Sequence, residues 1–509
     1  MDSRNYLTLV LLLLSVFAST WLLKRWHAAS QLPFPPGPKP KFITGNLKDV
    51  PTVQPWLTYT DWGKQYGEVV HVRVFGQHVV IVNSLNAAVE LFDRRARIYS
   101  DRPWLPMVDL TGWDYNMSFM PHGDKWRQYR RMFHQHFRRD AIVAYRPIQM
   151  RKIYDMLRNL LASPEHFFEH VKTLAAAIVM AVTYGYDVKP TNDRFVDLAE
   201  DGVKRICEAV FPGAFAVNSL PFLRHLPAWF PGCGFHKYGQ DTLKLIKEMQ
   251  DAPFEFVRQN MRDGVGSLCL LAELLESNDA QGGSKSQEKV IKEIAATSYA
   301  GGSDTTTSSM LTLFLALAMH PDVQRKAQNE IDTVVGSARL PEFEDRPSLP
   351  HVEAVYREIM RWRPVAPLGV AHAATEDDIY NGYFIPKGTT VLSNIWAIVH
   401  DESIYPEADK FNPERFLDVD GQLNGSDNIL TFGFGRRACV GRHVADATVW
   451  AAVVSVLSTF NIATAKDATG KDIDIDPAYS DGLVSHPLPF KCSITPRSDV
   501  AKKLVEEMF

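Results

Sequence analysis

Residues 432–441 of this 509-residue chain read FGFGRRACVG, and a run with helical periodicity, residues 442–459, follows directly. Glycines let the backbone approach the sulfur of Cys439 closely. The start of the next helix would bring N–H groups and the positive end of the helix dipole to this thiol, which lowers its pKa. Arg436 and Arg437 add positive charge. The stretch indicates a reactive or metal-binding thiolate, and the alternative is a buried structural cysteine in a turn.

The other cysteines point away from disulfides and zinc. The chain holds five cysteines, an odd number, and their spacing forms no C-x-x-C pattern. A reducing compartment, or one cysteine with a special role, explains this better than a disulfide framework. We expect four of them to be structural: Cys207, Cys233, Cys269 and Cys492.

Composition limits the class of protein. The chain is 46% hydrophobic and 22% charged, which excludes a mostly disordered chain, a collagen and a coiled coil. A net charge of −4 gives no global attraction to nucleic acid, and we expect no such partner. Helical periodicity dominates from about residue 125, strands are few, and no linker after residue 40 resembles a domain boundary. One large, mainly α body with small β-sheets is predicted.

An uncharged apolar segment, Tyr6–Leu23, precedes this body. As a helix it would be roughly 27 Å long, close to the thickness of the bilayer core. Lys24 and Arg25 follow at once, which predicts that the body faces the cytosol. We expect a single N-terminal transmembrane helix, with residues 1–26 as the anchor. A cleaved signal peptide is the alternative, because residues 28–30 could mimic a cleavage site.

Prolines follow the expected anchor. The run PFPPGP at residues 33–38 favours extended structure, so residues 27–45 are predicted to form a stiff hinge. The catalytic body would then occupy residues 46–509. Within it, alternating apolar residues predict two hairpins, over residues 70–82 and 380–393.

Helix boundaries can be predicted in three further places. Ser84 is placed to cap a helix over residues 86–96. Glu276–Glu288 has the composition of a flexible loop. A long helix is expected over about Lys289–Met319.

That long helix contains the run AGGSDTT at residues 300–306. Two glycines inside a helix cost roughly 1 kcal/mol each relative to alanine, which suggests a ligand close to the backbone or a local kink. Asp304 and Thr305 could relay protons there. A merely polar helix turn is the alternative.

The cysteine stretch has the pattern F-x-x-G-x-R-x-C-x-G, carried by Phe432, Gly435, Arg437, Cys439 and Gly441. Its chance occurrence in such a chain is on the order of 10⁻⁴. It resembles the haem-binding loop of the cytochrome P450 family. The resemblance implies that Cys439 is the axial thiolate ligand of haem iron and that Arg437 contacts a haem propionate.

Other motifs carry the same resemblance in the family's order. AGGSDTT matches the oxygen-activation motif A/G-G-x-D/E-T-T. Glu358 and Arg361 have the E-x-x-R form and could form a salt bridge on a helix, which alone is weak evidence. The resemblance adds Arg415, within FNPERF at residues 411–416, as the third member of a buried Glu–Arg–Arg network behind the haem.

Two motifs concern the propionates. Trp126 and Arg130 match W-x-x-x-R, and one helical turn places them on one face, suited to a carboxylate. His372, in AHAA at residues 371–374, lies where the family often places another propionate donor. The motifs span residues 126–441 and, with the anchor and the hinge, the resemblance covers essentially the whole chain.

The resemblance implies the mainly α cytochrome P450 fold, haem b (iron protoporphyrin IX) as cofactor, and a monooxygenase. A thiolate ligand favours O–O cleavage over reversible oxygen binding. Asp304 and Thr305 would steer water and protons to bound oxygen. The chain is similar to fungal microsomal members that tailor secondary metabolites, on residues 226–232 (LPAWFPG) and 55–58 (PWLT). The expected location is the endoplasmic reticulum membrane, with a lipophilic substrate such as a terpenoid.

An electron donor is also expected. The chain contains no G-x-G-x-x-G unit after a predicted strand, so a separate NADPH-dependent reductase is implied. Lys125–Arg139 holds six Lys or Arg residues and no Asp or Glu. It could dock an acidic reductase, or it could be an ordinary solvated helix face.

Three alternative functions remain. The enzyme could hydroxylate an aromatic, polyketide or indole-type metabolite instead of a terpenoid. It could be a haem-thiolate isomerase or dehydratase, although such members often lose the Asp–Thr pair that is present here. It could also be a non-catalytic haem carrier or sensor, which the full oxygen-activation motif argues against.

Overall fold

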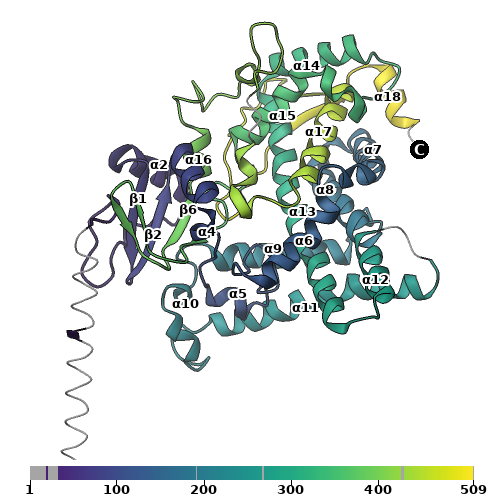
Figure 1. Cartoon of the computed structure of the whole chain (residues 1–509). Coiled ribbons are helices and arrows are strands. Elements are labelled where there is room, and N and C mark those ends of the chain that lie inside the picture. The colour runs from purple at the N-terminus through teal and green to yellow at the C-terminus, as the bar shows by residue number, and fades with distance from the viewer. Residues whose placement is uncertain (1–18, 21–31, 191, 266–268, 426–428, 508–509) are drawn as a thin grey trace, which may run out of the picture.

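The computed structural model describes residues 19–20, 32–190, 192–265, 269–425 and 429–507. Figure 1 shows a broad helical part and, at its left edge, a smaller part in which β1, β2 and β6 lie beside α2 and α16. The expected membrane span Tyr6–Leu23 lies outside the described residues, apart from Ser19 and Thr20, which are helical.

One long helix, α13 (Lys285–Met319), runs through the helical part. Its last quarter, about Met310–Ala318, is buried on every side, as expected for a helix that is mostly apolar all round. It packs against α8 (Phe167–Tyr184) and α17 (Arg442–Thr459), whose residues 447–457 are also buried. These three helices form the centre of the main hydrophobic core.

The remaining helices surround this core. In chain order they are α2 (Pro55–Tyr66), α3 (Leu85–Ala88), α4 (Ala96–Tyr99), α5 (Pro106–Leu110), α6 (Asp124–Phe137), α7 (Arg146–Ala162), α9 (Arg194–Val210), α10 (Ala216–Ser219), α11 (Phe235–Arg262), α12 (Leu270–Ala280), α14 (Pro321–Val334), α15 (Pro350–Trp362), α16 (Ile395–Val399) and α18 (Asp499–Glu506). Among the residues described, one helix is long and apolar enough to cross a membrane by length and composition, Pro164–Tyr184. Two thirds of its apolar window (67%) is buried inside the protein, as for a core helix.

The sheets are small, as expected. The largest has the strand order β1-β2-β6-β3, and two further sheets are two-stranded. Its strands β1 (Val69–Val74) and β2 (Gln77–Val82) form the first predicted hairpin. The other strands are β3 (His372–Ala373), β4 (Asp378–Tyr380), β5 (Tyr383–Ile385), β6 (Thr390–Ser393), β7 (Phe460–Thr464) and β8 (Cys492–Pro496). The mainly helical fold with small sheets is confirmed.

The second predicted hairpin is shorter than expected. β4 and β5 pair around Asn381 and Gly382, both with positive φ (49° and 81°), as a tight hairpin turn requires. The chain then leaves this hairpin, and β6 pairs in parallel with β2. The prediction of one hairpin over residues 380–393 was therefore wrong in its second half, because β6 finds its partner in a distant strand.

The helix expected over residues 86–96 is interrupted. Ser84 caps it as predicted, since its hydroxyl accepts a bond from the Ala87 N–H at 3.1 Å. After α3 the chain forms a π-helical stretch, η1 (Val89–Arg94), before α4 begins. The wider turn lets both Arg94 and Arg95 bond to Glu90, an arrangement that periodicity alone does not reveal.

The loop expected at Glu276–Glu288 is mostly helical, so this prediction was wrong. Helix α12 continues to Ala280 and α13 begins at Lys285, which leaves only residues 281–284 between them. Polar residues occupy the outer face of these helix ends, while Leu275 and Asn278 are buried. Composition suggested a loop because it does not show which face of a helix is solvated.

The described part of the expected hinge, residues 32–45, contacts strands of two sheets, β5 and β1. The Phe384 N–H donates to the Pro33 carbonyl at 2.8 Å and the His71 N–H donates to the Pro36 carbonyl at 2.9 Å. The ring of Phe34 stacks on the ring of His71 with centroids 4.9 Å apart. This segment is therefore fixed to the body.

Candidate functional site

Cys439 lies in a loop between a 3₁₀ turn, η8 (Gly435–Arg437), and the start of α17. Its N–H donates to the Phe432 carbonyl at 2.8 Å, which closes the loop. Gly435 has φ +55°, and a Cβ there would lie 2.1 Å from the Phe92 carbonyl oxygen. Only glycine fits that position, so the loop depends on Gly435 for its packing against Phe92, a different reason from the predicted approach of the backbone to the sulfur.

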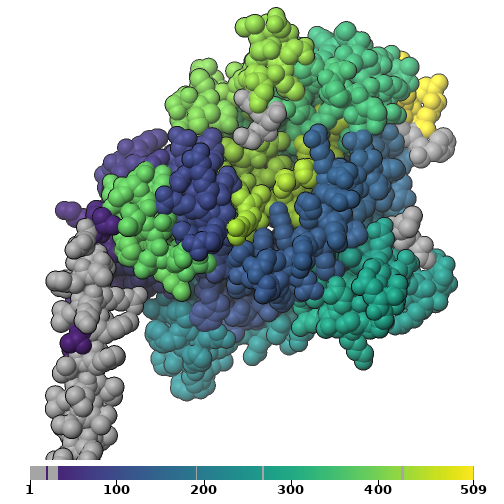
Figure 2. All heavy atoms as spheres, in the orientation of Figure 1, coloured from purple at the N-terminus to yellow at the C-terminus, as the bar shows by residue number. Residues whose placement is uncertain are grey.

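The Cys439 residue is exposed to solvent, but protein atoms surround its sulfur closely enough to desolvate the thiol. Figure 2 shows lime-coloured atoms of the segment around residues 430–450 in a hollow, bordered by blue atoms in the colour of α6. Burial raises the pKa of the thiol, while the Gly441 N–H and the charges of Arg130 and Arg442 act in the opposite direction. The expected lowering of the free thiol's pKa was therefore wrong, because burial outweighs the local positive groups. A metal would deprotonate the thiol regardless.

The two glycines of α13 have different roles. A Cβ on Gly301 would meet no atom within 4 Å, and this residue is exposed although Ala300 and Ser303 beside it are buried. A Cβ on Gly302 would lie 2.9 Å from Cγ2 of Val179 on α8. Gly302 thus permits close helix packing, and Gly301 leaves space open beside the helix. The helix continues through both, so no break occurs there.

The acid and the hydroxyl that follow make separate contacts. The Thr305 hydroxyl donates to the Gly301 carbonyl at 2.9 Å. Asp304 pairs with His486, with Oδ1 and Nε2 3.0 Å apart. Residues i and i+1 of a helix point in different directions, so the two side chains leave α13 on different sides.

A cluster of arginine side chains, with one tryptophan, lies where α6 meets the cysteine loop and β3. Arg437 donates to the carbonyls of Ser100 and Met120 at 2.7 and 2.8 Å, and its guanidinium carbon lies 4.4 Å from the centroid of the Trp126 ring. Arg130 donates to the Ala438 carbonyl at 2.7 Å. The structure thus brings three of the predicted residues together: Trp126, Arg130 and Arg437.

Arg102 belongs to the same cluster and was not predicted. Its side chain is buried and donates to the carbonyls of Ser118, Val370 and Ala371, each at 2.7 Å. Burial and the charge of Arg437 lower the pKa of Arg102, and Asp101 counteracts them. The only sequence signal was an arginine followed by proline in an apolar segment.

The charge balance of this cluster favours an anion. Burial lowers the pKa of Arg437 to about 10, with the charge of Arg130 adding to this effect and Asp101, the one acid involved, opposing it. Burial also lowers the pKa of Arg130. One buried cation (Arg102) and two half-buried ones (Arg130 and Arg437) with one acid among them are costly unless an anionic group binds there.

His372, on β3, is buried beside this cluster. Its Nδ1 lies 2.7 Å from the Tyr99 carbonyl, which can only accept, so Nδ1 carries the proton. Burial and the charge of Arg102 lower the pKa of His372. The neutral ring therefore leaves Nε2 as an acceptor, and donation to an anion from Nε2 would require a second proton.

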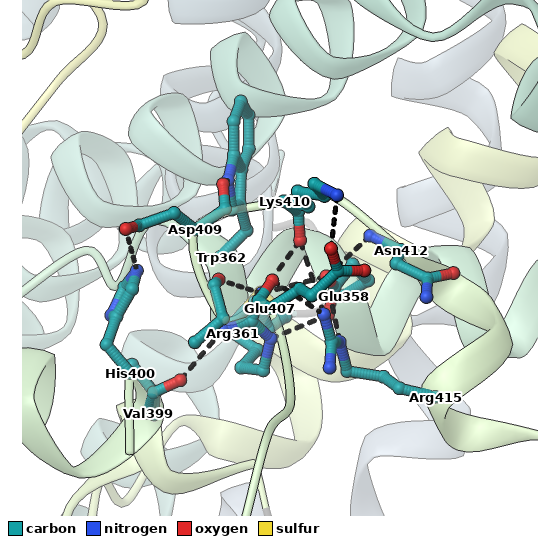
Figure 3. A network of polar contacts seen from close by, with 12 residues as sticks. Glu358, Arg361, Trp362, Val399, His400, Glu407, Asp409, Lys410, Asn412 and Arg415 are labelled. Atoms are coloured by element: carbon teal, nitrogen blue, oxygen red, sulfur yellow. Dashed lines mark hydrogen bonds and ion pairs between the residues drawn. The ribbon is translucent and has the colours of Figure 1, made fainter. Parts of the chain in front are cut away.

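Glu358, Arg361 and Arg415 form a buried network (Figure 3). The Glu358 carboxylate, fully buried, accepts from Arg361 at 2.7 and 2.8 Å and from Arg415 at 3.2 Å. Arg361 also donates to the Val399 carbonyl at 2.7 Å. The Thr431 hydroxyl donates to the Met360 carbonyl at 2.7 Å, which ties α15 to the segment before the cysteine loop. The three residues therefore meet as the motifs implied.

Exposed cations surround α6 and the turn after it. Trp126, Tyr129 and Phe133 face inward, whereas the exposed cations are Lys125, Arg127 and Arg131 on α6 and Arg138 and Arg139 just after its end. We call these five residues the basic face. It adjoins the cysteine loop, because Arg130 of the same helix bonds to Ala438.

Comparison with known proteins agrees with this geometry. The family model for cytochrome P450 matches residues 35–494. Cytochrome P450 monooxygenase COX1 of Coprinopsis cinerea is 40% identical over 507 residues, which covers 97% of this chain and 98% of that protein. Cytochrome P450 monooxygenase claR of Ampulloclitocybe clavipes is 40% identical over 475 residues (92% and 88%). Cytochrome P450 monooxygenase ppsD of Aspergillus oryzae is 38% identical over 506 residues (98% and 95%). The chain therefore belongs to the cytochrome P450 family of haem-containing monooxygenases.

Proposed function

We propose that this protein is a membrane-anchored haem-thiolate monooxygenase that inserts one oxygen atom from O₂ into a lipophilic small molecule, as a tailoring step of fungal secondary metabolism. The observation that carries the proposal is that the structure holds both an accessible thiol, at Cys439, and a cluster of largely desolvated cations around Arg437. The fungal origin of the similar monooxygenases supports the biological setting.

The residues present fit a haem. Cys439 would hold the iron through its thiolate, and the excess positive charge around Arg102, Arg130 and Arg437 suits two propionates. Trp126, on α6, would border this cluster through its contact with Arg437. A propionate beside His372 would favour the doubly protonated imidazole, which can donate a hydrogen bond to that propionate. The open space at Gly301 leaves room on the α13 side.

When bound, the haem supplies oxygen activation, and a thiolate ligand favours O–O cleavage. The protein's contribution would come from α13. The Thr305 hydroxyl can exchange its bond to the Gly301 carbonyl for one to a water in the site, and the Asp304 carboxylate, on another side of the helix, can hold and release a proton. The Glu358 network would hold the cysteine loop from behind.

The basic face supports electron delivery by a separate NADPH-dependent reductase. Its cations adjoin the cysteine loop, so an acidic partner docked there would lie near the haem edge. Complementary charge mainly increases the rate of association. If the basic face were only an ordinary solvated helix surface, the rate of reductase association would not depend on its charge.

Membrane attachment is proposed through residues 6–23, with residues 1–26 as the anchor, residues 27–45 as the connection and residues 46–509 as the catalytic body, on the cytosolic side of the endoplasmic reticulum. Large apolar side chains support a membrane-facing side: Phe42 is 96% exposed and Trp229 is 80% exposed. A Cβ on Gly213 would lie 3.6 Å from Thr52, which brings the segment before α10 close to the N-terminal residues. A lipophilic substrate could enter from the bilayer there.

Co-expression of the full-length chain with a fungal reductase under ¹⁸O₂, with terpenoid, polyketide, aromatic and indole scaffolds, tests the proposal. We expect a product that carries one ¹⁸O atom and requires both proteins. A product that forms without O₂ or reductase would instead identify an isomerase or dehydratase. Haem loading without any turnover across these scaffold classes would favour a carrier or sensor.

A further inference from the structure

His486 meets the oxygen-activation motif from a distant part of the chain. It lies in the connection between β7 and β8, and its Nε2 is 3.0 Å from Oδ1 of Asp304 on α13. The side chains are 24% and 33% exposed, so the pair is neither fully solvated nor sealed in the core.

The segment that carries His486 is held at several points. The Ser308 hydroxyl of α13 donates to the Ser485 carbonyl at 2.6 Å, and the Ser485 N–H donates to the Val365 carbonyl at 2.9 Å. The Ser480 N–H donates to the His486 carbonyl at 2.8 Å, and the His486 N–H donates back to the Ser480 hydroxyl at 3.0 Å. These bonds fix the backbone of His486 relative to α13, so the imidazole is preorganised for Asp304.

The other groups around Asp304 do not neutralise its charge. Burial raises the pKa of Cys207 on α9 to about 12, and the negative charge of Asp304 contributes to this rise, so the thiol stays neutral. Glu208, also on α9, adds a second acid near Cys207. Among the described residues, His486 is therefore the side chain that pairs with the Asp304 carboxylate, with Nε2 and Oδ1 3.0 Å apart.

We propose that His486 is a positioning residue for the oxygen-activation motif: it holds the Asp304 carboxylate at the edge of α13 and so controls its presentation to the site. This inference rests on the proposed role of Asp304 in proton delivery. Asp304 and Thr305 leave the helix in different directions, so Thr305 cannot hold the Asp304 carboxylate in place. Without another fixed partner, the carboxylate would adopt other rotamers. The segment that carries His486 is also bonded to the Val365 carbonyl, so the position of Val365 affects the position of His486 relative to Asp304.

The test compares His486→Gln, His486→Arg and the wild type in the reconstituted holoenzyme with reductase, measuring product formed and hydrogen peroxide released per NADPH. We expect His486→Gln to lower product per NADPH about two- to fivefold, the range for a partly exposed ion pair, with haem content unchanged. His486→Arg provides N–H groups that can pair with the Asp304 carboxylate and should restore coupling. Lys491→Gln removes an exposed cation from the same connection and should leave coupling at the wild-type value.

A second measurement does not depend on turnover. Carbethoxylation of His486, followed by mass spectrometry, should be faster in Asp304→Asn than in the wild type because the ring loses its partner. Equal labelling rates, wild-type coupling in His486→Gln, or failure of His486→Arg to restore coupling would each overturn the inference. If Asp304→Asn is itself fully coupled, the proposed role of Asp304 fails instead.

Discussion

The guanidinium of Arg437 stacks over the ring of Trp126, 4.4 Å from its centroid, and so joins the cysteine loop to helix α6. The two residues are far apart in sequence and belong to different elements: Trp126 is buried on α6, and Arg437 ends a 3₁₀ turn. Arg437 also bonds to carbonyls of Ser100 and Met120. One side chain thus connects three segments that are distant in sequence.

Replacing Arg437 by Gln should weaken haem binding about tenfold or more, because a charge-assisted bond to a propionate contributes roughly 1.5–3 kcal/mol. Haem retained per protein after gel filtration, read by the pyridine haemochrome assay, measures this. Arg436→Gln, at the exposed neighbour, is the matched control and should retain haem. Equal retention by both variants would contradict the placement of Arg437.

Replacing Cys439 by Ala should abolish the thiolate-type Soret band of the reduced carbon monoxide complex, because a thiol is the ligand proposed for the iron. Cys492→Ala, a half-buried cysteine on β8, should keep the band. Persistence of the band in Cys439→Ala would show that another group ligates the iron.

Replacing Thr305 by Ala should leave haem binding intact yet divert electrons to hydrogen peroxide, since the proposed proton path loses its hydroxyl. Thr307 makes the same type of bond, to the Ser303 carbonyl at 3.0 Å, but is buried in the core. Thr307→Ala is therefore the control, and its peroxide yield should match the wild type. Unchanged coupling in Thr305→Ala would exclude the proposed role.

The adjacent glycines of α13 should respond differently to alanine. Gly301→Ala adds a methyl group to open space and gains up to about 1 kcal/mol of helix propensity. Gly302→Ala places a Cβ 2.9 Å from Val179, and overpacking of this kind typically costs about 1–3 kcal/mol. Thermal unfolding should therefore rank Gly302→Ala below Gly301→Ala. Val179→Ala should relieve part of the defect in the double variant, and a double variant no better than additive would argue against this clash.

Reversing charge on the basic face by Arg127→Glu, Arg131→Glu and Arg138→Glu should raise the reductase concentration needed for half-maximal turnover. The loss should diminish at high ionic strength, where charge attraction is screened. Lys39, Lys41 and Lys48, exposed and far from α6 in sequence, offer a control triple of equal charge change. Unchanged turnover of the α6 variant at low reductase would contradict a docking role.

Contacts between residues close in sequence were predictable from the residues themselves, whereas contacts between distant residues, such as Glu358 with Arg415, were implied only by the family resemblance. The Glu358–Arg361 pair follows from helical spacing, and the cysteine loop follows from its glycines. Arg102 gave only a weak sequence signal and His486 gave none, because their roles arise only when the fold brings β3 and the β7–β8 connection to the site. The π-helical stretch at Val89–Arg94 was missed because apolar periodicity does not record a single wider turn.

The attachment of residues 33–36 to two sheets has a mechanical consequence. Tension applied along the N-terminal segment would load the bonds from Phe384 to Pro33 and from His71 to Pro36 first. Those bonds lead into β5 and β1, strands of two different sheets, whereas α13 and α17 lie in a separate cluster of the core. We therefore expect force applied at the N-terminal end of the chain to be borne by the strands before it reaches the helices around the cysteine loop.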